Sequence, residues 1–212
     1  MGRQRTIIQT FSDAITGKTT LMLKFLIAGV AVAAGFAYPP RPEKPVEPDV
    51  QPLTVIPYKA SWKCEDCTPE EQYVLEQLQE HTKISDRNAL ATIMGNIKQE
   101  SKFIPYICQG GARVSYSDCR SGGYGLIQWT SVGRYNNLGK FCEKYGCDPS
   151  SLEGQTRYMI NESVFQRYLP EFEGRGKTVH QYMTPAYYWL GWGIKGNREL
   201  YAYDYHKKLK YS

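Results

Sequence analysis

Seven prolines fall between residues 38 and 57, and this run sets the limits of any folded domain in the chain. A proline fixes its own backbone φ angle and lacks the amide hydrogen that a helix or a central strand requires. Residues 38–57 therefore predict an extended, semi-rigid spacer. We expect a basic leader with an apolar segment over residues 1–37, a linker over 38–60 and a folded domain over 61–212.

The segment before the linker is apolar enough to meet a membrane. Residues 21–37 read LMLKFLIAGVAVAAGFA, with Lys24 as the one charged side chain. The uninterrupted part, residues 25–37, has the length of a signal-peptide core, whereas the whole segment makes a marginal span if Lys24 reaches the interface. A cleaved signal peptide and a retained anchor both stay open, and the long basic leader favours the anchor. Its positive charges predict a cytoplasmic N-terminus and an exported domain.

The cysteines indicate an oxidising compartment. There are six of them, and an even number behind an export segment predicts disulfides. We favour the local pairs Cys108–Cys119 and Cys142–Cys147, because short loops close easily. Cys64 and Cys67 have a zinc-like spacing, but no second C-x-x-C follows, so a zinc site is the alternative to a third disulfide.

The net charge of the chain is mildly positive, at +5. Such a charge suits an anionic surface such as a cell wall or a membrane. It is too small and too evenly spread to indicate a nucleic-acid partner.

Caps and periodicity predict a mostly helical domain with a small irregular insertion, which is an α+β class. Thr68-Pro69-Glu70-Glu71 forms a capping box with proline at the first helical position, and residues 150–153 (SSLE) form a second box. Residues 102–130 are rich in Gly, Ser and Tyr and predict loops and short strands. We expect helices over residues 68–80, 86–101, 132–145, 151–164, 185–190 and 197–210.

The predicted helix over residues 86–101 carries the side chain of greatest chemical interest. Leu90, Ile93 and Ile97 mark its buried stripe, and Glu100 continues that stripe at the C-terminal end. Burial and the negative end of the helix dipole both favour a neutral, protonated carboxyl there. Glycoside cleavage needs such a group to protonate the leaving sugar oxygen. The alternative is a glutamate that points to solvent at a frayed helix end.

A glycine-rich segment follows, with GGYGLIQW over residues 122–129. A glycine such as Gly125 lets the backbone approach a ligand closely. Tyr124 and Trp129 offer flat faces on which sugar rings could rest, and Gln128 offers an amide to sugar hydroxyls. A plain turn with its aromatic side chains in the core is the alternative.

Two stretches together resemble the phage tail lysozyme family: GNIKQESKFIP over residues 95–105 and GYGLIQWT over residues 123–130. In that family and its lysozyme-like relatives, the goose-type lysozymes and lytic transglycosylases, a Glu-Ser pair ends a helix and a Gly-Leu-x-Gln segment lies across the cleft. The resemblance spans residues 70–210 and implies a lysozyme-like domain. We expect neither a cofactor nor a metal.

The resemblance implies cleavage of the β-1,4 bond between N-acetylmuramic acid and N-acetylglucosamine in peptidoglycan, for host lysis or wall penetration. It assigns Glu100 as the catalytic residue. It places Ser101, Tyr124, Gly125, Gln128 and Trp129 at the substrate. Weaker matches are Arg134 and Leu138 after the tryptophan, Gln155 and Glu162 in a later helix, and Arg198, Ala202 and Tyr205 in the last helix. We expect Glu162 to support its helix or form a salt bridge.

Glycosidases commonly use a second carboxylate, and here its identity is open. Some phage lysozymes carry an aspartate nine residues after the glutamate, but this chain has Gln109 there. Asp118 is the candidate second carboxylate, although it can equally cap its own turn. A lytic transglycosylase needs no second carboxylate, because the substrate's own hydroxyl attacks, so that activity stays open as an alternative.

Other enzyme classes fit the sequence less well. The histidines His81, His180 and His206 are isolated and lack the spacing of a zinc peptidase or amidase. A non-catalytic wall-binding or virion structural protein that reuses the fold is the alternative from another class. The expected partners are peptidoglycan glycan strands, the bacterial inner membrane through residues 21–37, and other virion proteins. The expected location is the host periplasm, a membrane or the virion.

Overall fold

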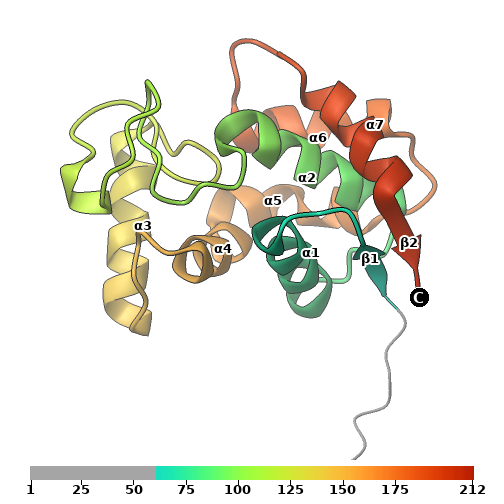
Figure 1. Ribbon diagram of the computed structural model, residues 1–212, viewed down its shortest axis with the longest axis horizontal. Helices are drawn as coiled ribbons and strands as arrows, with labels where there is room; N and C mark the ends of the chain where they lie inside the picture. Colours follow the sequence, from blue (N-terminus) through green and yellow to red (C-terminus); the bar gives the residue numbers. More distant parts are fainter. Residues whose placement is uncertain (1–60) are drawn as a thin grey trace, which may run out of the picture. The chain divides into compact units, whose positions relative to one another are not determined.

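Helix α2 (Arg87–Ser101) runs through the centre of the computed structural model, which describes residues 61–212 (Figure 1). The predicted leader, apolar segment and linker lie outside these residues. None of the helices in the described part combines the length and the hydropathy that a membrane crossing requires. Helices α1, α5, α6 and α7 all pack against α2. The elements in chain order are β1 (Trp62–Cys64), α1 (Pro69–His81), α2, the short 3₁₀ helix η1 (Tyr116–Asp118), α3 (Val132–Tyr145), α4 (Leu152–Asn161), α5 (Ser163–Glu173), α6 (Val179–Leu190), α7 (Arg198–Lys208) and β2 (Leu209–Tyr211).

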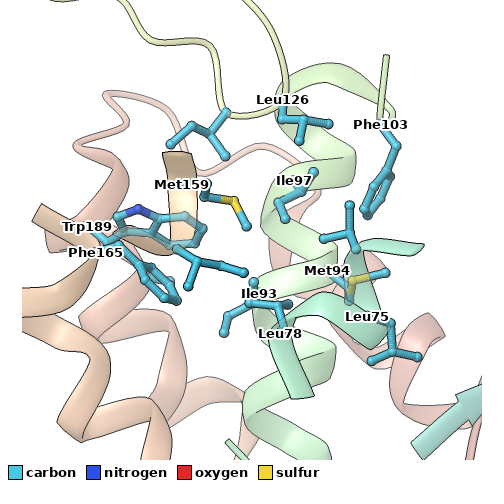
Figure 2. Packing of buried hydrophobic residues seen from close by; sticks show 14 of the residues in the cluster. Leu75, Leu78, Ile93, Met94, Ile97, Phe103, Leu126, Met159, Phe165 and Trp189 are labelled. Carbon is cyan, nitrogen blue, oxygen red and sulfur yellow. The ribbon is translucent and has the colours of Figure 1, made fainter. Parts of the chain in front are cut away.

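The central position of α2 follows from its sequence. Every side chain from Ala89 to Ile97 is buried, so the helix is covered on all sides rather than along one stripe. Asp86 caps its first turn by accepting hydrogen bonds from the backbone amides of Asn88 and Ala89. Figure 2 shows Ile97 on the side of α2 that faces the side chains contributed by α4, α5 and α6, which include Met159, Phe165 and Trp189.

Helix α7 approaches α2 closely at Gly95. A Cβ atom at this position would lie 2.4 Å from the backbone nitrogen of Ala202 and 2.8 Å from the carbonyl oxygen of Arg198. Only glycine lets the two backbones come so near. Gly95, the first residue of the GNIKQESKFIP stretch, therefore sets the distance between α2 and α7.

The prediction of a mostly helical domain is confirmed, and the first three helices have the expected bounds within two residues. The Thr68 capping box is present, but the N-cap of α4 is Ser151 rather than Ser150. The predicted helix over residues 151–164 ends at Asn161, and a separate helix that was not predicted, α5, runs from Ser163 through Pro170. Helix α6 begins at Val179 rather than at residue 185, because it continues through Pro185. Each proline removes one backbone hydrogen bond from its helix, and the burial of aromatic side chains on α5 and α6 offsets that loss. Local helix propensity does not include this tertiary contribution.

The strands lie elsewhere than expected. Residues 102–130 form turns with two isolated bridges, Ile107 with Arg113 and Cys108 with Tyr124, rather than strands. The two-stranded antiparallel sheet instead joins β1 to β2, so it pairs the two ends of the described domain. The last helix accordingly ends at Lys208 rather than at residue 210, because the chain from Leu209 onward adopts the extended conformation of β2 and pairs with β1.

All six cysteines are paired. The predicted pairs Cys108–Cys119 and Cys142–Cys147 are both formed, and Cys64 bonds Cys67. Because Cys64 and Cys67 are joined in a disulfide, they are not available as the thiolate ligands of the alternative zinc site. Within residues 61–212, no three His, Cys, Asp or Glu side chains gather to hold a metal ion.

A buried carboxylate ties α1 to α2 and α7. Glu71 is 4% exposed and accepts hydrogen bonds from Lys98 Nζ (2.9 Å), the Thr68 backbone amide (3.0 Å) and the Tyr205 hydroxyl. Burial alone would raise the pKa of Glu71. The hydrogen bonds from Tyr205, Lys98 and Thr68 outweigh burial and hold the pKa below its ordinary value of 4.5.

Replacing Gly95 with alanine should separate α2 from α7. We expect Gly95→Ala to lower the free energy of unfolding by about 1–3 kcal/mol, because its methyl group would overlap the α7 backbone. Urea unfolding followed by circular dichroism measures the change. The matched control is Gly133→Ala in α3, where an added Cβ has nothing within 4 Å, and which should be neutral or stabilising. Equal effects of the two substitutions would contradict the close approach.

Glu71 should make stability depend on pH. Because its folded pKa lies below 4.5, its ionisation stabilises the fold above that pH, and the contribution is lost as the pH falls through the folded pKa. Glu71→Gln should therefore lower the free energy of unfolding at neutral pH. It should also make that free energy fall less steeply as the pH decreases below 4.5. Urea unfolding at a series of pH values tests this. Glu76→Gln, an exposed change on the same helix, should leave the profile unaltered.

Candidate active site

Glu100 is the second-last residue of α2, and the backbone leaves the helix directly after it. Lys102 and Phe103 both have positive φ angles, 54° and 64°, which turn the chain sharply away from the helix axis. The side chain of Glu100 is 15% exposed. The expectation of a largely covered carboxyl at this helix end is met, and the alternative of a solvent-directed glutamate at a frayed end is not.

The carboxylate of Glu100 has a cationic partner that the sequence analysis did not foresee. Arg198, the first residue of α7, donates a hydrogen bond from its guanidinium group to Glu100 Oε1. The Arg198 side chain is only 7% exposed. Its other terminal nitrogen donates to the carbonyl oxygens of Ile194 (2.8 Å) and Lys195 (2.9 Å), so the guanidinium is fixed by the backbone of the preceding loop.

The ion pair changes the expected chemistry of the site. The sequence predicts a neutral carboxyl, on the basis of burial and the helix dipole alone. The structure instead gives Glu100 a charge-assisted hydrogen bond, which is the stronger and more directional kind.

The connection between α6 and α7 is held on the C-terminal end of α2 at two neighbouring residues (Figure 1). Beside the Glu100 pair, Gln99 accepts a hydrogen bond from the backbone amide of Asn197 (2.9 Å). A Cβ at Gly196 would lie 3.0 Å from the Gln99 side chain. This loop and the end of α2 therefore form one rigid unit around the carboxylate.

The predicted Gly-Tyr-Gly-Leu turn does lie beside Glu100. Ser101 Oγ donates to the carbonyl oxygen of Leu126 (2.8 Å), which joins the end of α2 to the turn. On the other side, the Leu126 amide donates to Gln155 Oε1 (2.8 Å). Gly125 has a φ of 72°, and a Cβ there would lie 2.3 Å from Gln155. Ser101 and Gly125 thus shape the turn, and Ser101 itself is buried.

Tyr124 and Trp129 occupy the core rather than the surface. Both are 0% exposed. Tyr124 packs against the rings of Tyr116 and Tyr135, and Trp129 packs against Tyr158. Their faces are covered by protein and are not open to a sugar ring, which corrects the expectation drawn from their position in the motif. Burying these rings contributes apolar area that holds the turn in place.

Gln128 remains partly exposed, at the position where the turn ends. Its φ of 50° is unusual for a residue with a side chain. Its amide nitrogen donates to the carbonyl oxygens of Gly125 (3.1 Å) and Ile107 (3.3 Å), which stabilises this conformation. Of the predicted substrate-binding side chains in the turn, Gln128 is the one that reaches the surface.

The candidate second carboxylate, Asp118, is exposed at the end of η1. It accepts a hydrogen bond from Ser115 Oγ (2.6 Å), as a residue that closes its own turn does. Gln109, which stands where some phage lysozymes carry an aspartate, accepts a hydrogen bond from the backbone amide of Gly123 (3.1 Å). Gln109 thus supports the turn at Gly123, and Gln155 supports it at Leu126.

Glu162 forms the expected salt bridge. Its two oxygens accept from Arg134 Nε (2.6 Å) and Nη2 (2.7 Å), and Glu162 is 4% exposed. This bidentate pair joins the first turn of α3 to the junction of α4 and α5. The Tyr158 hydroxyl donates to the carbonyl oxygen of Arg134 (3.2 Å), which links the pair to the ring that covers Trp129.

The buried amide of Gln155 should be essential to the position of the turn. It also donates to the carbonyl oxygens of Pro105 (2.6 Å) and Pro149 (2.7 Å). Gln155→Met removes all three bonds at similar volume, and we expect a loss of more than about 2 kcal/mol of stability from the polar groups left unpaired. Hydrogen exchange at the Leu126 amide should speed up as well. Gln77→Met on α1, where the hydrogen bonds are exposed, is the control. Unchanged exchange at Leu126 would contradict the assigned role.

Comparison with known families agrees with this geometry. The family model described as phage tail lysozyme matches residues 70–185, more than half of the 212 residues, and the match includes Glu100, the turn and the Arg134–Glu162 pair. Arg198 lies beyond the matched residues. A comparison with curated proteins finds no match. With Glu100 at the end of α2 and the Gly123–Trp129 turn bonded to that helix end through Ser101, the chain belongs to the phage tail lysozyme family.

Proposed function

We propose that this chain cleaves the β-1,4 bond between N-acetylmuramic acid and N-acetylglucosamine in peptidoglycan, with Glu100 as the residue that protonates the leaving oxygen. The observation that carries the proposal is the largely covered carboxyl of Glu100, held beside the Gly123–Trp129 turn in a member of a lysozyme family. A carboxyl shielded from water and fixed in direction is suited to general acid catalysis.

Arg198 has a positioning role in this proposal. Its guanidinium group is itself anchored to Ile194 and Lys195, so it holds Oε1 of Glu100 in a fixed direction. The bound glycan then displaces water from the carboxyl. The proton that Glu100 passes to the glycosidic oxygen is acquired from solvent before the glycan binds, and the carboxylate left by the transfer re-forms its ion pair with Arg198 when the product leaves.

A lytic transglycosylase is the second candidate. The observation that favours it is the structural use of both residues considered for a second carboxylate position: Gln109 holds Gly123, and Asp118 holds its own turn. A transglycosylase needs only one acid–base residue, because the C6 hydroxyl of N-acetylmuramic acid attacks the anomeric carbon and forms an anhydro sugar. The two activities therefore differ in their products rather than in the role of Glu100.

We further propose that the domain works outside the cytoplasm, on the cell wall. The three disulfides fit an oxidising compartment. Residues 21–37 are proposed to export the domain or anchor it in the bacterial inner membrane, with the proline-rich linker as a spacer. Host lysis and wall penetration during infection are both compatible with such a tether, the latter with other virion proteins as partners.

Glu100→Gln should abolish cleavage while the fold remains. We expect the release of soluble fragments from purified sacculi to fall by about 10²–10⁴-fold, the range for loss of a general acid. Glu153→Gln, an exposed change on α4, is the matched control and should keep full activity. Urea unfolding of each variant shows whether the fold is retained. Undiminished activity of folded Glu100→Gln would refute the assignment.

Mass spectrometry of the released muropeptides separates the candidates. Reducing ends indicate a hydrolase, and anhydro ends indicate a transglycosylase. If the native chain binds sacculi but releases no fragments, the protein is a wall-binding member of the family and the proposal of cleavage is wrong.

A further inference from the structure

Four aromatic side chains form a continuous row that leads from α5 to the Glu100 pair. Tyr168 stacks on Tyr188 with ring centroids 5.9 Å apart, Tyr188 meets Tyr187 at 5.3 Å, and Tyr187 meets Trp192 at 5.2 Å. We call these four residues the aromatic row. Its last member, Trp192, lies against the guanidinium of Arg198, whose central carbon is 4.9 Å from the Trp192 ring centroid. Each step along the row is a direct side-chain contact.

The row is open to solvent at its centre. Tyr187 is 47% exposed and Tyr188 57% exposed, while Tyr168 and Trp192 are half-buried. An isolated exposed tyrosine needs no explanation, but contiguous exposed rings commonly mark a binding surface. The rings also brace one another through edge and stacked contacts, so little side-chain entropy would be lost when a ligand covers them.

We propose that the aromatic row binds the glycan strand of peptidoglycan at sugar units beyond the bond that is cleaved. A pyranose ring has a face of C–H groups that packs on an aromatic ring, and its hydroxyl and N-acetyl groups can bond the tyrosine hydroxyls. The row is continuous with Arg198 and Glu100, so a strand that lies along it is directed to the carboxyl. This inference rests on the proposed function, and it names where the substrate is held.

At the Trp192 end of the row, the charges favour an uncharged sugar over an anionic lipid surface. The two cations of the α6–α7 region that follow Trp192 are both already paired with carboxylates: Lys195 with Glu199, and Arg198 with Glu100. Glu199 also accepts from His180 (2.9 Å). A membrane-binding surface would instead offer unpaired cations around its aromatic side chains.

Tryptophan fluorescence can locate the ligand on the row. Trp129 and Trp189 are fully buried, so among the four tryptophans only Trp62 and Trp192 can meet a ligand at the surface. We expect a soluble β-1,4-linked N-acetylglucosamine hexasaccharide to change the emission of the native chain. Trp192→Phe should abolish the change, and Trp62→Phe should keep it. A change that depends on Trp62, or no change at all, would overturn the inference.

Binding to intact sacculi tests the exposed centre of the row. In the Glu100→Gln background, which prevents cleavage, Tyr187→Ser with Tyr188→Ser should raise the dissociation constant by about tenfold or more. Tyr203→Ser, which removes an exposed tyrosine from α7, is the matched control and should bind as before. Co-sedimentation with purified sacculi measures both. Binding to vesicles with anionic headgroups should be unaffected by the double substitution.

The outcomes separate this inference from the proposed function. Equal sacculus binding with and without Tyr187 and Tyr188 would contradict the row while cleavage by the native chain stood. Loss of vesicle binding in place of sacculus binding would make the row a membrane surface and overturn the inference. If the native chain released no muropeptides but its sacculus binding required the row, cleavage would be wrong and the row would be a glycan-binding surface.

Discussion

The site depends on the close contact between the backbones of α2 and α7. Gly95 permits this contact, and it brings the first residue of α7 to the last turn of α2, where Arg198 meets Glu100. Gln99 and Glu71 strengthen the same helix pair from two further positions. The direction of the Glu100 carboxylate therefore follows from a helix packing distance that Gly95 determines.

The loops around Glu100 owe their order to internal hydrogen bonds and buried rings rather than to regular secondary structure. Gln155 and Gln109 each bond the turn through a side-chain amide, and Ser101 joins it to α2. The disulfide Cys108–Cys119 closes the same region. Such irregular segments are stable only when their backbone polar groups find partners, and these glutamines supply them.

Local signals predicted the parts of this fold that local physics determines. The Thr68 capping box and the apolar stripe of α2 located the first helices, and short loops identified two disulfides. Contacts between distant residues were beyond reach: Arg198 lies 98 residues from its partner. The prolines of α5 and α6 concealed helices that packing stabilises. Tyr124 and Trp129 were assigned to the substrate because composition does not tell which face of a turn is buried.

The strand pair β1–β2 has a geometric consequence. Trp62 donates to the carbonyl of Ser85 and its ring lies under Arg87, so the pair lies at the N-terminal end of α2. Glu100 is at the other end, roughly 20 Å away by the rise of an α-helix. The first and last described residues therefore lie at the N-terminal end of α2, and Glu100 lies at its C-terminal end. A fusion partner or surface attachment joined at Ser61 or at Ser212 is therefore attached at the N-terminal end of α2. The end of the domain that carries Glu100 is left free to contact a polymer.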